Sequence, residues 1–254
     1  MVTLSITSCK RLHLFEKTIK SFYDNCEDNS SISHIYHFDD SSSDEDRLKM
    51  ETILRFLFPS AHLHNYRFDS QSFPGKKRHC YVMIEWLNVM KSGNFFNFHL
   101  EDDWLFNSKF SLSGLRNFLE MKSEAAYVGV SQFLRDFPDD IKAEIEGNYW
   151  KWYYDPDKEL LSNLFLDTKT MEKTNIDGFW CYFINWPYFG FRPGLWNTSK
   201  LSEVEKFNCE LDSSFELDFA VDLAKKYVSY CRIDSICEHI GNESSAYDIN
   251  NSTR

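Results

Sequence analysis

Residues 98–106 read FHLEDDWLF, an apolar strand pattern that three consecutive acidic residues interrupt. Glu101, Asp102 and Asp103 have apolar neighbours on both sides, so the chain places adjacent like charges next to side chains that avoid water. Such charges are costly in that setting unless a cation joins them. The alternative is a solvated loop in which an aspartate caps the following element. The stretch therefore predicts the end of a buried strand, followed by either a cation site or a capped turn.

Strands and helices alternate along the chain around this stretch. The pattern predicts strands at 2–7, 32–38, 62–66, 95–100 and 126–130, and helices from the apolar spacing at 12–22, 48–57, 80–90 and 112–121. Helices of this length between strands imply a mainly parallel sheet that is covered on both faces. We therefore predict one α/β domain over residues 1–254, with loops from Phe133 to about Gly178, where the pattern breaks.

The composition predicts a globular protein. Hydrophobic residues make up 43% of the chain and aromatic residues 17%, which argues against disorder. A formal charge of -11 argues against a general nucleic-acid binder, because phosphate contacts need a basic surface. The polar start is unlike a secretory signal, and no apolar run approaches the roughly 20 residues that span a bilayer. We expect a soluble, cytoplasmic protein, located in the host cytoplasm if the source is a virus, with no transmembrane segment and no nucleic-acid partner.

The seven cysteines are scattered, and none of them forms a CxxC pair. An odd number without such spacing does not indicate a disulfide framework. Because free cysteine is among the residues most often buried, we expect reduced thiols that mostly pack in the core.

Polar residues follow three of the predicted strands at the point where each strand ends. They are Thr7 to Arg11 after the first strand, Asp39 and Asp40 after the second, and the acidic triplet after the fourth. Parallel α/β sheets bind ligands at the carboxyl ends of their strands. In an acidic chain, Mg²⁺ or Mn²⁺ bound by one or two carboxylates can supply the charge that a diphosphate needs. The pattern therefore predicts a metal and diphosphate site at this edge.

Six segments, in this order along the chain, resemble the nucleotide-sugar glycosyltransferases of the GT-A fold, close to the large family-2-like group. They are VTLSITSCKR (2–11), HFDDSSSD (37–44), FHLEDDW (98–104), NWPYFGFRPGLW (185–196), SSFELDFA (213–220) and CEHIGNESSAYDIN (237–250). The resemblance covers most of the chain and is weakest from 133 to 180. It implies a Rossmann-like, mostly parallel sheet with helices on both faces, a nucleotide-sugar-binding half at 1–132, and an acceptor and catalytic half at 133–254.

The same resemblance implies an activity. The expected reaction is metal-dependent transfer of a hexosyl or deoxyhexosyl group, with inversion, from a UDP- or GDP-sugar donor. The expected acceptor is a hydroxyl of a glycan or of another molecule.

The resemblance makes the acidic triplet a DxD-type motif for Mn²⁺ or Mg²⁺. It implies that Asp103 is the direct metal ligand, that Asp102 contacts substrate, and that Glu101 lies near the ribose or a water on the metal. Glutamate replaces the first aspartate of the motif, which leaves these individual roles open. His239 matches a C-terminal histidine that reaches back to the metal or diphosphate, and a structural histidine is the alternative.

Glu216 is the candidate general base, because the resemblance places an acidic residue of inverting enzymes at this position. Such a base takes the proton of the acceptor hydroxyl and contributes roughly 10²- to 10⁴-fold. Asp218 is the second candidate and Asp212 the third. The alternative is a helix start, where acidic residues gain about 0.3 to 1 kcal/mol from the helix dipole.

The nucleoside is expected at the first two strand ends. There Thr7, Ser8 and Arg11 follow one strand, and Asp39 and Asp40 follow the next. Their carboxylates can accept hydrogen bonds from a base or a ribose, although turn formation explains the same residues.

Two further predicted substrate contacts are cationic. Arg78 stands with Lys76 and Lys77 at the start of a helix, where cations oppose the dipole, so we expect a phosphate or sugar contact there. Arg192 lies inside the aromatic segment 185–196 and must find a partner, for which we suggest a phosphate or an acceptor hydroxyl. Trp186 and its aromatic neighbours in that segment are expected to form an acceptor-side wall, with core packing as the alternative.

Two other functions remain open from the sequence. A nucleotidyltransferase or another NTP-using α/β enzyme would share the carboxylates, but the first strand end has no glycine-rich phosphate loop. A non-catalytic protein that binds a sugar nucleotide or a carbohydrate would keep the fold without turnover.

Overall fold

The structure is a computed structural model. It describes residues 1–69, 78–131, 143–146, 149–152, 173–176, 179–182, 189–204, 215–232 and 234–241. Within these ranges only the backbone is described at residues 78 and 217 and in the four short segments between 143 and 182.

The helices and strands follow one another in the order β1 (Val2–Ser8), α1 (Leu12–Asn25), β2 (Ile32–Asp40), α2 (Asp44–Leu57), β3 (His62–Phe68), α3 (Arg78–Lys91), β4 (Phe96–Glu101), β5 (Trp104–Phe106), α4 (Leu112–Met121), β6 (Ala125–Gly129), β7 (Ala143–Glu146), β8 (Tyr149–Trp152), β9 (Lys173–Ile176), β10 (Phe179–Tyr182), β11 (Gly194–Asn197), α5 (Phe215–Ala224), β12 (Val228–Arg232) and β13 (Cys237–His239). Short 3₁₀ helices lie at Asn29–Ser31 and Thr198–Glu203.

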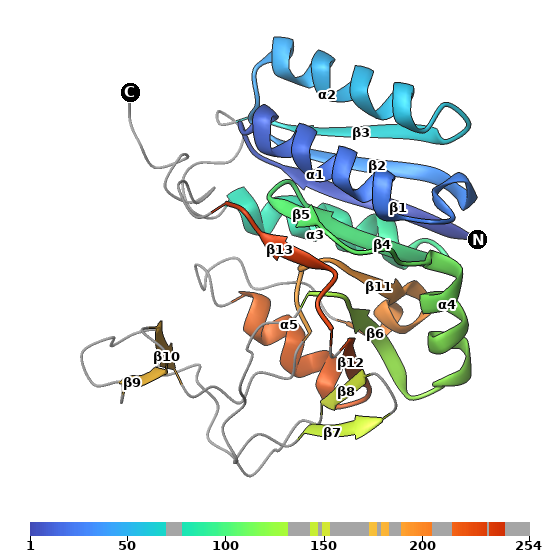
Figure 1. Cartoon of the computed structure of the whole chain (residues 1–254), viewed down its shortest axis with the longest axis vertical. Helices are drawn as coiled ribbons and strands as arrows, with labels where there is room; N and C mark the ends of the chain where they lie inside the picture. The colour runs from blue at the N-terminus through green and yellow to red at the C-terminus, as the bar shows by residue number, and fades with distance from the viewer. Residues whose placement is uncertain are drawn as a thin grey trace.

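Nine strands form one central sheet in the order β3-β2-β1-β4-β11-β6-β12-β8-β7 (Figure 1). Strands β3, β2, β1 and β4 are parallel neighbours, as are β6 and β12. Strand β11 is antiparallel to both β4 and β6, so β4 and β6 run the same way on either side of it. Six of the seven strands from β3 to β12 therefore share one direction, which confirms the predicted α/β fold with a mostly parallel sheet.

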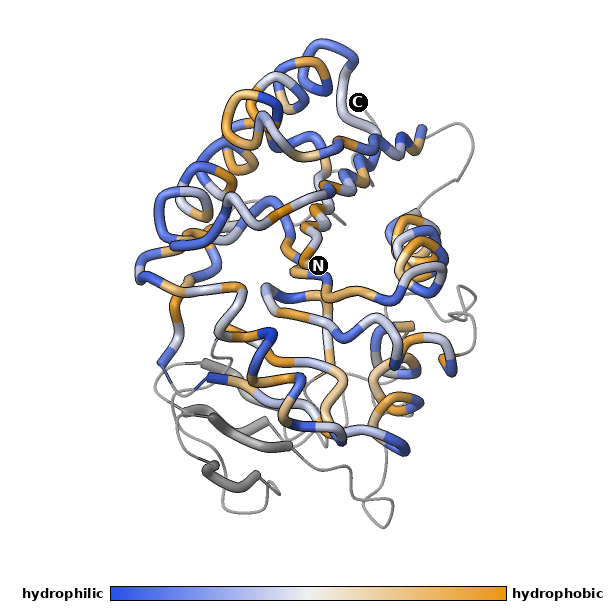
Figure 2. Tube along the Cα trace, turned by 90° about the vertical axis from the view of Figure 1, so that its right-hand side faces the viewer, coloured by the Kyte–Doolittle hydropathy of each residue, from blue (hydrophilic) through white to orange (hydrophobic). Residues whose placement is uncertain are grey.

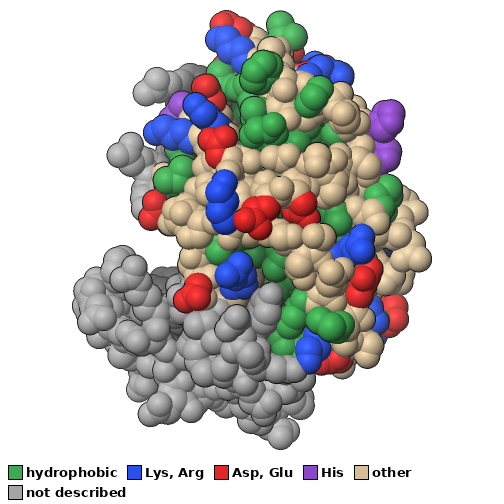
Figure 3. Space-filling model, turned by 45° about the vertical axis from the view of Figure 1, so that its right-hand side comes forward, with side chains coloured by type: hydrophobic (Ala, Val, Ile, Leu, Met, Phe, Trp, Pro, Cys, Tyr) green, Lys and Arg blue, Asp and Glu red, His purple; other side chains and the backbone are tan. Residues whose placement is uncertain are grey.

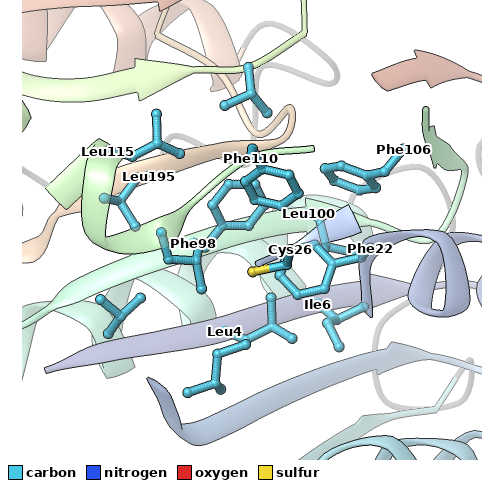
Figure 4. Close-up of a cluster of buried hydrophobic side chains, with 14 of the residues drawn as sticks. Leu4, Ile6, Phe22, Cys26, Phe98, Leu100, Phe106, Phe110, Leu115 and Leu195 are labelled. Carbon is cyan, nitrogen blue, oxygen red and sulfur yellow. The ribbon is translucent and has the colours of Figure 1, made fainter. Parts of the chain in front are cut away.

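Apolar side chains pack on both faces of the sheet. On one face, residues of α1, α2 and α4 pack against β1 and β4, and Figure 4 shows Leu4 and Ile6 near Phe22 and Phe98. On the other face, residues of α3 and α5 pack against β2, β6 and β11. Burying one such aromatic or aliphatic side chain contributes about 1.5 to 3 kcal/mol. Hydrophilic and hydrophobic residues alternate along the helices, as expected for helices with one buried side (Figure 2).

The helix at Asp44–Leu57 differs from its prediction in one detail. Met50 and Leu54 are fully buried, whereas Leu48, which the spacing assigned to the apolar side, is 65% exposed. The side chain of Ser43 caps this helix by accepting a hydrogen bond from the backbone N–H of Asp46 at 3.1 Å. The first turn then carries three acidic residues, which the helix dipole favours.

The prediction of loops from Phe133 to about Gly178 is wrong at three places, β7, β8 and β9, and a fourth strand, β10, begins directly after that range. Strands β7 and β8 form an antiparallel pair, and β8 pairs with β12 at the end of the central sheet. Strands β9 and β10 form a separate antiparallel pair. Each strand has only four residues, too short for a reliable period of two, and β8 is fixed by pairing with a strand about 80 residues away. The rest of this segment lies outside the described residues.

Four cysteines confirm the prediction of buried, reduced thiols. They are Cys9, Cys26, Cys231 and Cys237. The prediction is wrong for Cys80 in α3, whose sulfur forms a disulfide.

None of the helices that the structure describes has the length and apolar character needed to cross a bilayer. Figure 3 shows basic and acidic side chains interspersed over the described part of one face.

Candidate active site

The predicted strand ends do meet at one edge of the sheet. Thr7 of β1 pairs in register with Glu101 of β4, and Ser8 pairs with Asp39 of β2. The loops that follow β1 and β2 contain two non-glycine residues with positive φ, Lys10 at 53° and Ser41 at 64°. Residues in this left-handed region are uncommon and concentrate at functional sites.

Arg11 joins the first strand end to the acidic motif. Its Nη1 lies 2.8 Å from Asp103 Oδ2, and its Nη2 forms an ion pair with Asp102 Oδ1. All three side chains are buried, with exposures of 7% for Arg11, 1% for Asp102 and 8% for Asp103. The cation that the sequence required beside the carboxylates is therefore present in the chain itself.

Asp102 ties two loops together. Its Oδ2 accepts a hydrogen bond from the backbone N–H of Cys9 at 3.0 Å, and its carbonyl accepts one from Thr18 at 2.9 Å. Burial raises the pKa of Asp102 to about 7, against the opposing effect of Arg11. This geometry supports a structural role for Asp102, and its predicted contact with substrate stays a prediction.

Asp103 is positioned by the C-terminal part of the chain. Strand β13 pairs with β5, and the backbone N–H of Ile240 donates to the carbonyl of Asp103 at 2.8 Å. His239 Nε2 lies 3.2 Å from Asp103 Oδ2. Burial opposes ionisation, but His239 and Arg11 lower the pKa of Asp103 below its usual value. His239 therefore reaches the acidic motif, and its predicted contact with a metal or diphosphate stays a prediction.

Gly241 allows the chain to pass directly over Asp103. A Cβ placed at Gly241 would overlap Oδ2 of Asp103 and lie 2.9 Å from its Cβ and Cγ. The other carboxylate oxygen, Asp103 Oδ1, is buried and has no hydrogen-bond partner among the described residues. A buried oxygen of this kind is costly without a partner, and a hard cation would satisfy it.

Glu101 stands at the end of β4, where its Oε2 accepts a hydrogen bond from Trp104 Nε1 at 3.2 Å. Burial, together with the negative charges of Asp103 and Glu216, raises the pKa of Glu101 to about 8, while Arg192 opposes the shift. These interactions place the acidic motif, Glu216 and Arg192 in one electrostatic group.

Glu216 lies in the first turn of α5, and its side chain is 29% exposed. Its Oε1 is 3.9 Å from Nε2 of His79, in the first turn of α3. Burial raises the pKa of Glu216 to about 7, against the opposing effect of Arg192. A carboxylate with a pKa near neutrality can be ionised and still accept a proton, which suits a general base.

Asp218 occupies a different position on α5. Burial raises its pKa, but the charges that act on it are those of Asp222 and Lys225, on its own helix and just beyond it. Residues two apart on a helix do not share a face. The geometry therefore favours Glu216 over Asp218, and Asp212 lies outside the described residues.

His79 is a site residue that the sequence analysis missed. Burial, together with the charge of Arg11, lowers the pKa of His79 to about 4 while Asp103 opposes the shift, so the ring is neutral near pH 7. The ring also lies 5.8 Å from that of Phe215. The signal was present as the histidine after three consecutive cations at 76–78, but only the cations had been considered.

The carboxylate of Asp39 is fully engaged by the chain. Its Oδ1 accepts hydrogen bonds from Arg47 Nε at 2.6 Å and the backbone N–H of Ser42 at 3.1 Å, and its Oδ2 accepts one from Ser8 at 2.9 Å. A small pocket beside it is lined by His37, Asp39, Arg47, Asn65, Tyr66 and Arg67. Asp39 thus shapes the loop after β2, which fits the alternative of turn formation.

Two other residues predicted to contact the nucleoside are also buried. Asp40 accepts a hydrogen bond from Ser41, and Thr7 lies at the end of β1.

The prediction of an aromatic acceptor-side wall is wrong for the described part of segment 185–196. Phe189 and Trp196 are fully buried and Phe191 is 2% exposed. They pack against α3 and α5, where the ring of Trp196 lies 5.8 Å from that of Trp86. For Trp196 the reason is the position of β11 inside the sheet, and Phe189 and Phe191, which precede β11, join the same core cluster.

The remaining predicted residues are placed only in part. The carbonyl of Arg192 accepts a hydrogen bond from the hydroxyl of Tyr127 at 3.1 Å, and the guanidinium charge of Arg192 acts on Glu101 and Glu216. Arg78 begins α3, but its side chain is not described, and Trp186 lies outside the described residues.

Among the side chains that are described, no three His, Cys, Asp or Glu are grouped as a ready-made metal site. The predicted ligand set Asp103, Glu101 and His239 therefore stays a prediction.

The strand order of the sheet and the helices that cover it are those of the GT-A fold, which solved glycosyltransferase structures share. The mannosyltransferase PcManGT from Pyrobaculum calidifontis, solved with GDP-Man and Mn²⁺, is similar over 96% of this chain and 58% of its own, with a TM-score of 0.59 and 13% identity. TarS from S. aureus is similar over 91% of this chain and 36% of its own, with a TM-score of 0.51 and 11% identity. No protein-family model and no curated protein matches the sequence. The chain thus spans about a third to three fifths of the length of these two structures.

Proposed function

We propose that this chain is a metal-dependent glycosyltransferase that moves a sugar from a UDP- or GDP-sugar to a hydroxyl of a glycan or another acceptor. The observation that carries the proposal is the meeting of Asp103, Glu101, Glu216 and Arg192 at the carboxyl edge of a GT-A sheet. The mannosyltransferase of similar fold was solved with GDP-Man and Mn²⁺, which agrees with a sugar-nucleotide donor and a divalent metal.

The acidic motif fits a divalent metal by its chemistry. Asp103 Oδ1 is a buried carboxylate oxygen without a hydrogen-bond partner among the described residues, and Mg²⁺ and Mn²⁺ prefer oxygen ligands of this type. In the proposal Asp103 binds the ion directly, with Glu101 and His239 beside it. When bound, the ion neutralises the charge that develops on the departing nucleotide diphosphate.

Glu216 is proposed as the general base. The acceptor hydroxyl oxygen attacks the anomeric carbon of the donor sugar while Glu216 takes the hydroxyl proton, and the bond to the diphosphate oxygen breaks. The elevated pKa of Glu216 lets it accept this proton near neutral pH. A single displacement of this kind inverts the configuration at the anomeric carbon. Arg192, whose charge acts on both Glu101 and Glu216, is proposed to contact the donor or the acceptor.

The test is a panel of UDP- and GDP-sugars incubated with the protein and Mn²⁺ or EDTA. Slow hydrolysis releases the nucleotide diphosphate and needs no known acceptor. We expect release with one class of donor, with Mn²⁺ and not with EDTA, and a strong reduction in Glu216→Gln. Donors that bind and raise the melting temperature, but are never turned over even with candidate glycan acceptors, would support the non-catalytic binding protein instead.

A further inference from the structure

We propose that Arg11 neutralises the carboxylates of Asp102 and Asp103 in the metal-free protein, as a bound divalent ion would. Because Arg11 already supplies this positive charge, tight metal binding depends on a diphosphate. This inference rests on the proposed function for the identity of the second ligand. Its core, that Arg11 and a divalent ion neutralise the same carboxylates, is tested without any nucleotide.

The first argument is burial. Asp102 and Asp103 are adjacent in sequence, and their side chains are only 1% and 8% exposed. Two ionised carboxylates so close together repel one another strongly when water is excluded. Arg11 is bonded to both of them and is itself 7% exposed, so the three groups form one buried unit. Removing the cation would leave two uncompensated buried charges, which is strongly destabilising.

The second argument concerns which oxygens remain. Asp102 Oδ1 is bonded to Arg11, and Asp102 Oδ2 accepts from the backbone of Cys9. Asp103 Oδ2 is shared by Arg11 Nη1 at 2.8 Å and His239 Nε2 at 3.2 Å. Only Asp103 Oδ1 is left, buried and without a hydrogen-bond partner among the described residues. The two aspartates therefore offer an incoming ion a single oxygen.

One aspartate oxygen, even with Glu101 and His239 beside it, is a weak site for Mg²⁺ or Mn²⁺, which prefer six ligands and use substrate phosphates to complete the set. Charge points the same way. Two aspartates and one arginine sum to a formal charge of -1, so a divalent ion alone leaves the buried unit positive, and the anionic oxygens of a diphosphate restore the balance. Without Arg11 the aspartates sum to -2, which a divalent ion matches by itself. Arg11 thereby couples the metal to the diphosphate.

The experiment compares Arg11→Met with Arg47→Met by thermal unfolding in EDTA and in Mn²⁺, with no nucleotide. Arg47 is the matched control, because its side chain is also 7% exposed and pairs with a buried aspartate, Asp39, through Nε at 2.6 Å. Both variants should melt about 6 °C or more below the unmodified chain in EDTA, because each leaves a buried carboxylate without its cationic partner. Mn²⁺ alone should restore most of the loss in Arg11→Met, restore little in Arg47→Met, and shift the unmodified chain little.

The inference is overturned if Mn²⁺ alone leaves Arg11→Met unchanged, or if it stabilises the unmodified chain as strongly as the variant. Should Arg11→Met be obtained only unfolded, refolding in Mn²⁺ or EDTA decides: folding with Mn²⁺ alone supports the inference, and failure in both overturns it. Arg11→Lys, which keeps the charge, should fold in EDTA and gain little from Mn²⁺. The proposed function fails separately, if Mn²⁺ with UDP or GDP gives the unmodified chain no shift beyond that of either alone.

Discussion

At the scale of single residues, Asp103 is held from three directions. Arg11 comes from the loop after β1, His239 from β13, and Gly241 presses its backbone against the carboxylate. Such contacts fix the direction in which Oδ1 points, and a site held by its neighbours needs little rearrangement when it binds.

We predict that Asp103→Asn folds but loses the response to metal. Asparagine has nearly the same shape and can keep one oxygen toward Arg11, but it lacks the charge that a hard cation requires. The joint shift in melting temperature with Mn²⁺ and UDP or GDP should disappear. A variant that is unfolded in every condition would instead assign Asp103 a purely structural role.

We predict that Glu216→Gln separates binding from chemistry. Glutamine keeps the size of the side chain but cannot take a proton, so donor affinity should stay within a few fold while transfer falls by roughly 10²-fold or more. Asp218→Asn is the matched control on the same helix and should remain active. If Asp218→Asn is inactive and Glu216→Gln transfers sugar at a near-normal rate, the base lies two residues further along α5.

The pH dependence of transfer follows from the same residue. The pKa of Glu216 is raised to about 7, and a base works only when ionised, so the rate should rise with pH and level off above about 7. The measurement is the pH profile of kcat/KM, which reports the pKa of the base in the ligand-free protein. His79→Gln, which alters the partner 3.9 Å from Glu216, should move the midpoint of this rise. An unchanged midpoint would mean that His79 acts on packing alone.

At the scale of elements, β13 is the piece that completes the site. It is a three-residue strand paired with β5, and Gly241 follows it with no room for a side chain. We predict that Gly241→Ala destabilises the protein by about 1 to 3 kcal/mol, because the added Cβ displaces either Asp103 or the chain that carries His239. The response to Mn²⁺ and nucleotide should weaken as well. Gly190→Ala is the control, since a Cβ there meets nothing within 4 Å, and it should change little in a denaturant titration.

The elements also show what a sequence can predict. Apart from β5, whose three residues pair with the distant β13, the strands and helices before Gly129 follow from local apolar spacing, and the site edge follows from polar residues at strand ends. The strands β7 to β10 were missed because they are short and β8 is defined by a distant partner. Trp196 was assigned to a ligand wall because an aromatic residue near a strand has the same signature whether it meets a sugar or the core. His79 was missed since its role depends on which helix, α5, packs beside α3.

At the scale of the whole molecule, ligand binding should stabilise the native state by mass action. A donor product at about 100 times its Kd adds about 2.7 kcal/mol, provided that it does not bind the unfolded chain. We predict that UDP or GDP raises the melting temperature with Mn²⁺ and raises it much less with EDTA. Equal shifts in both conditions would contradict a metal bridge between Asp103 and the diphosphate.

The reversed strand β11 has a consequence for how the chain is made. Only 23 residues separate β4 from β6 in the sequence, yet β11 lies between these strands in the sheet, although 64 residues separate it from the end of β6. During synthesis β4 can pair only with β1 and keeps one unpaired edge, and β6 has neither of its sheet neighbours, until residues 194–197 have left the ribosome. A nascent chain in that interval exposes apolar edge strands, which are prone to pair wrongly. Translation speed across this interval therefore bears on yield, and holding chaperones would be of most use to the growing polypeptide just before β11 is delivered.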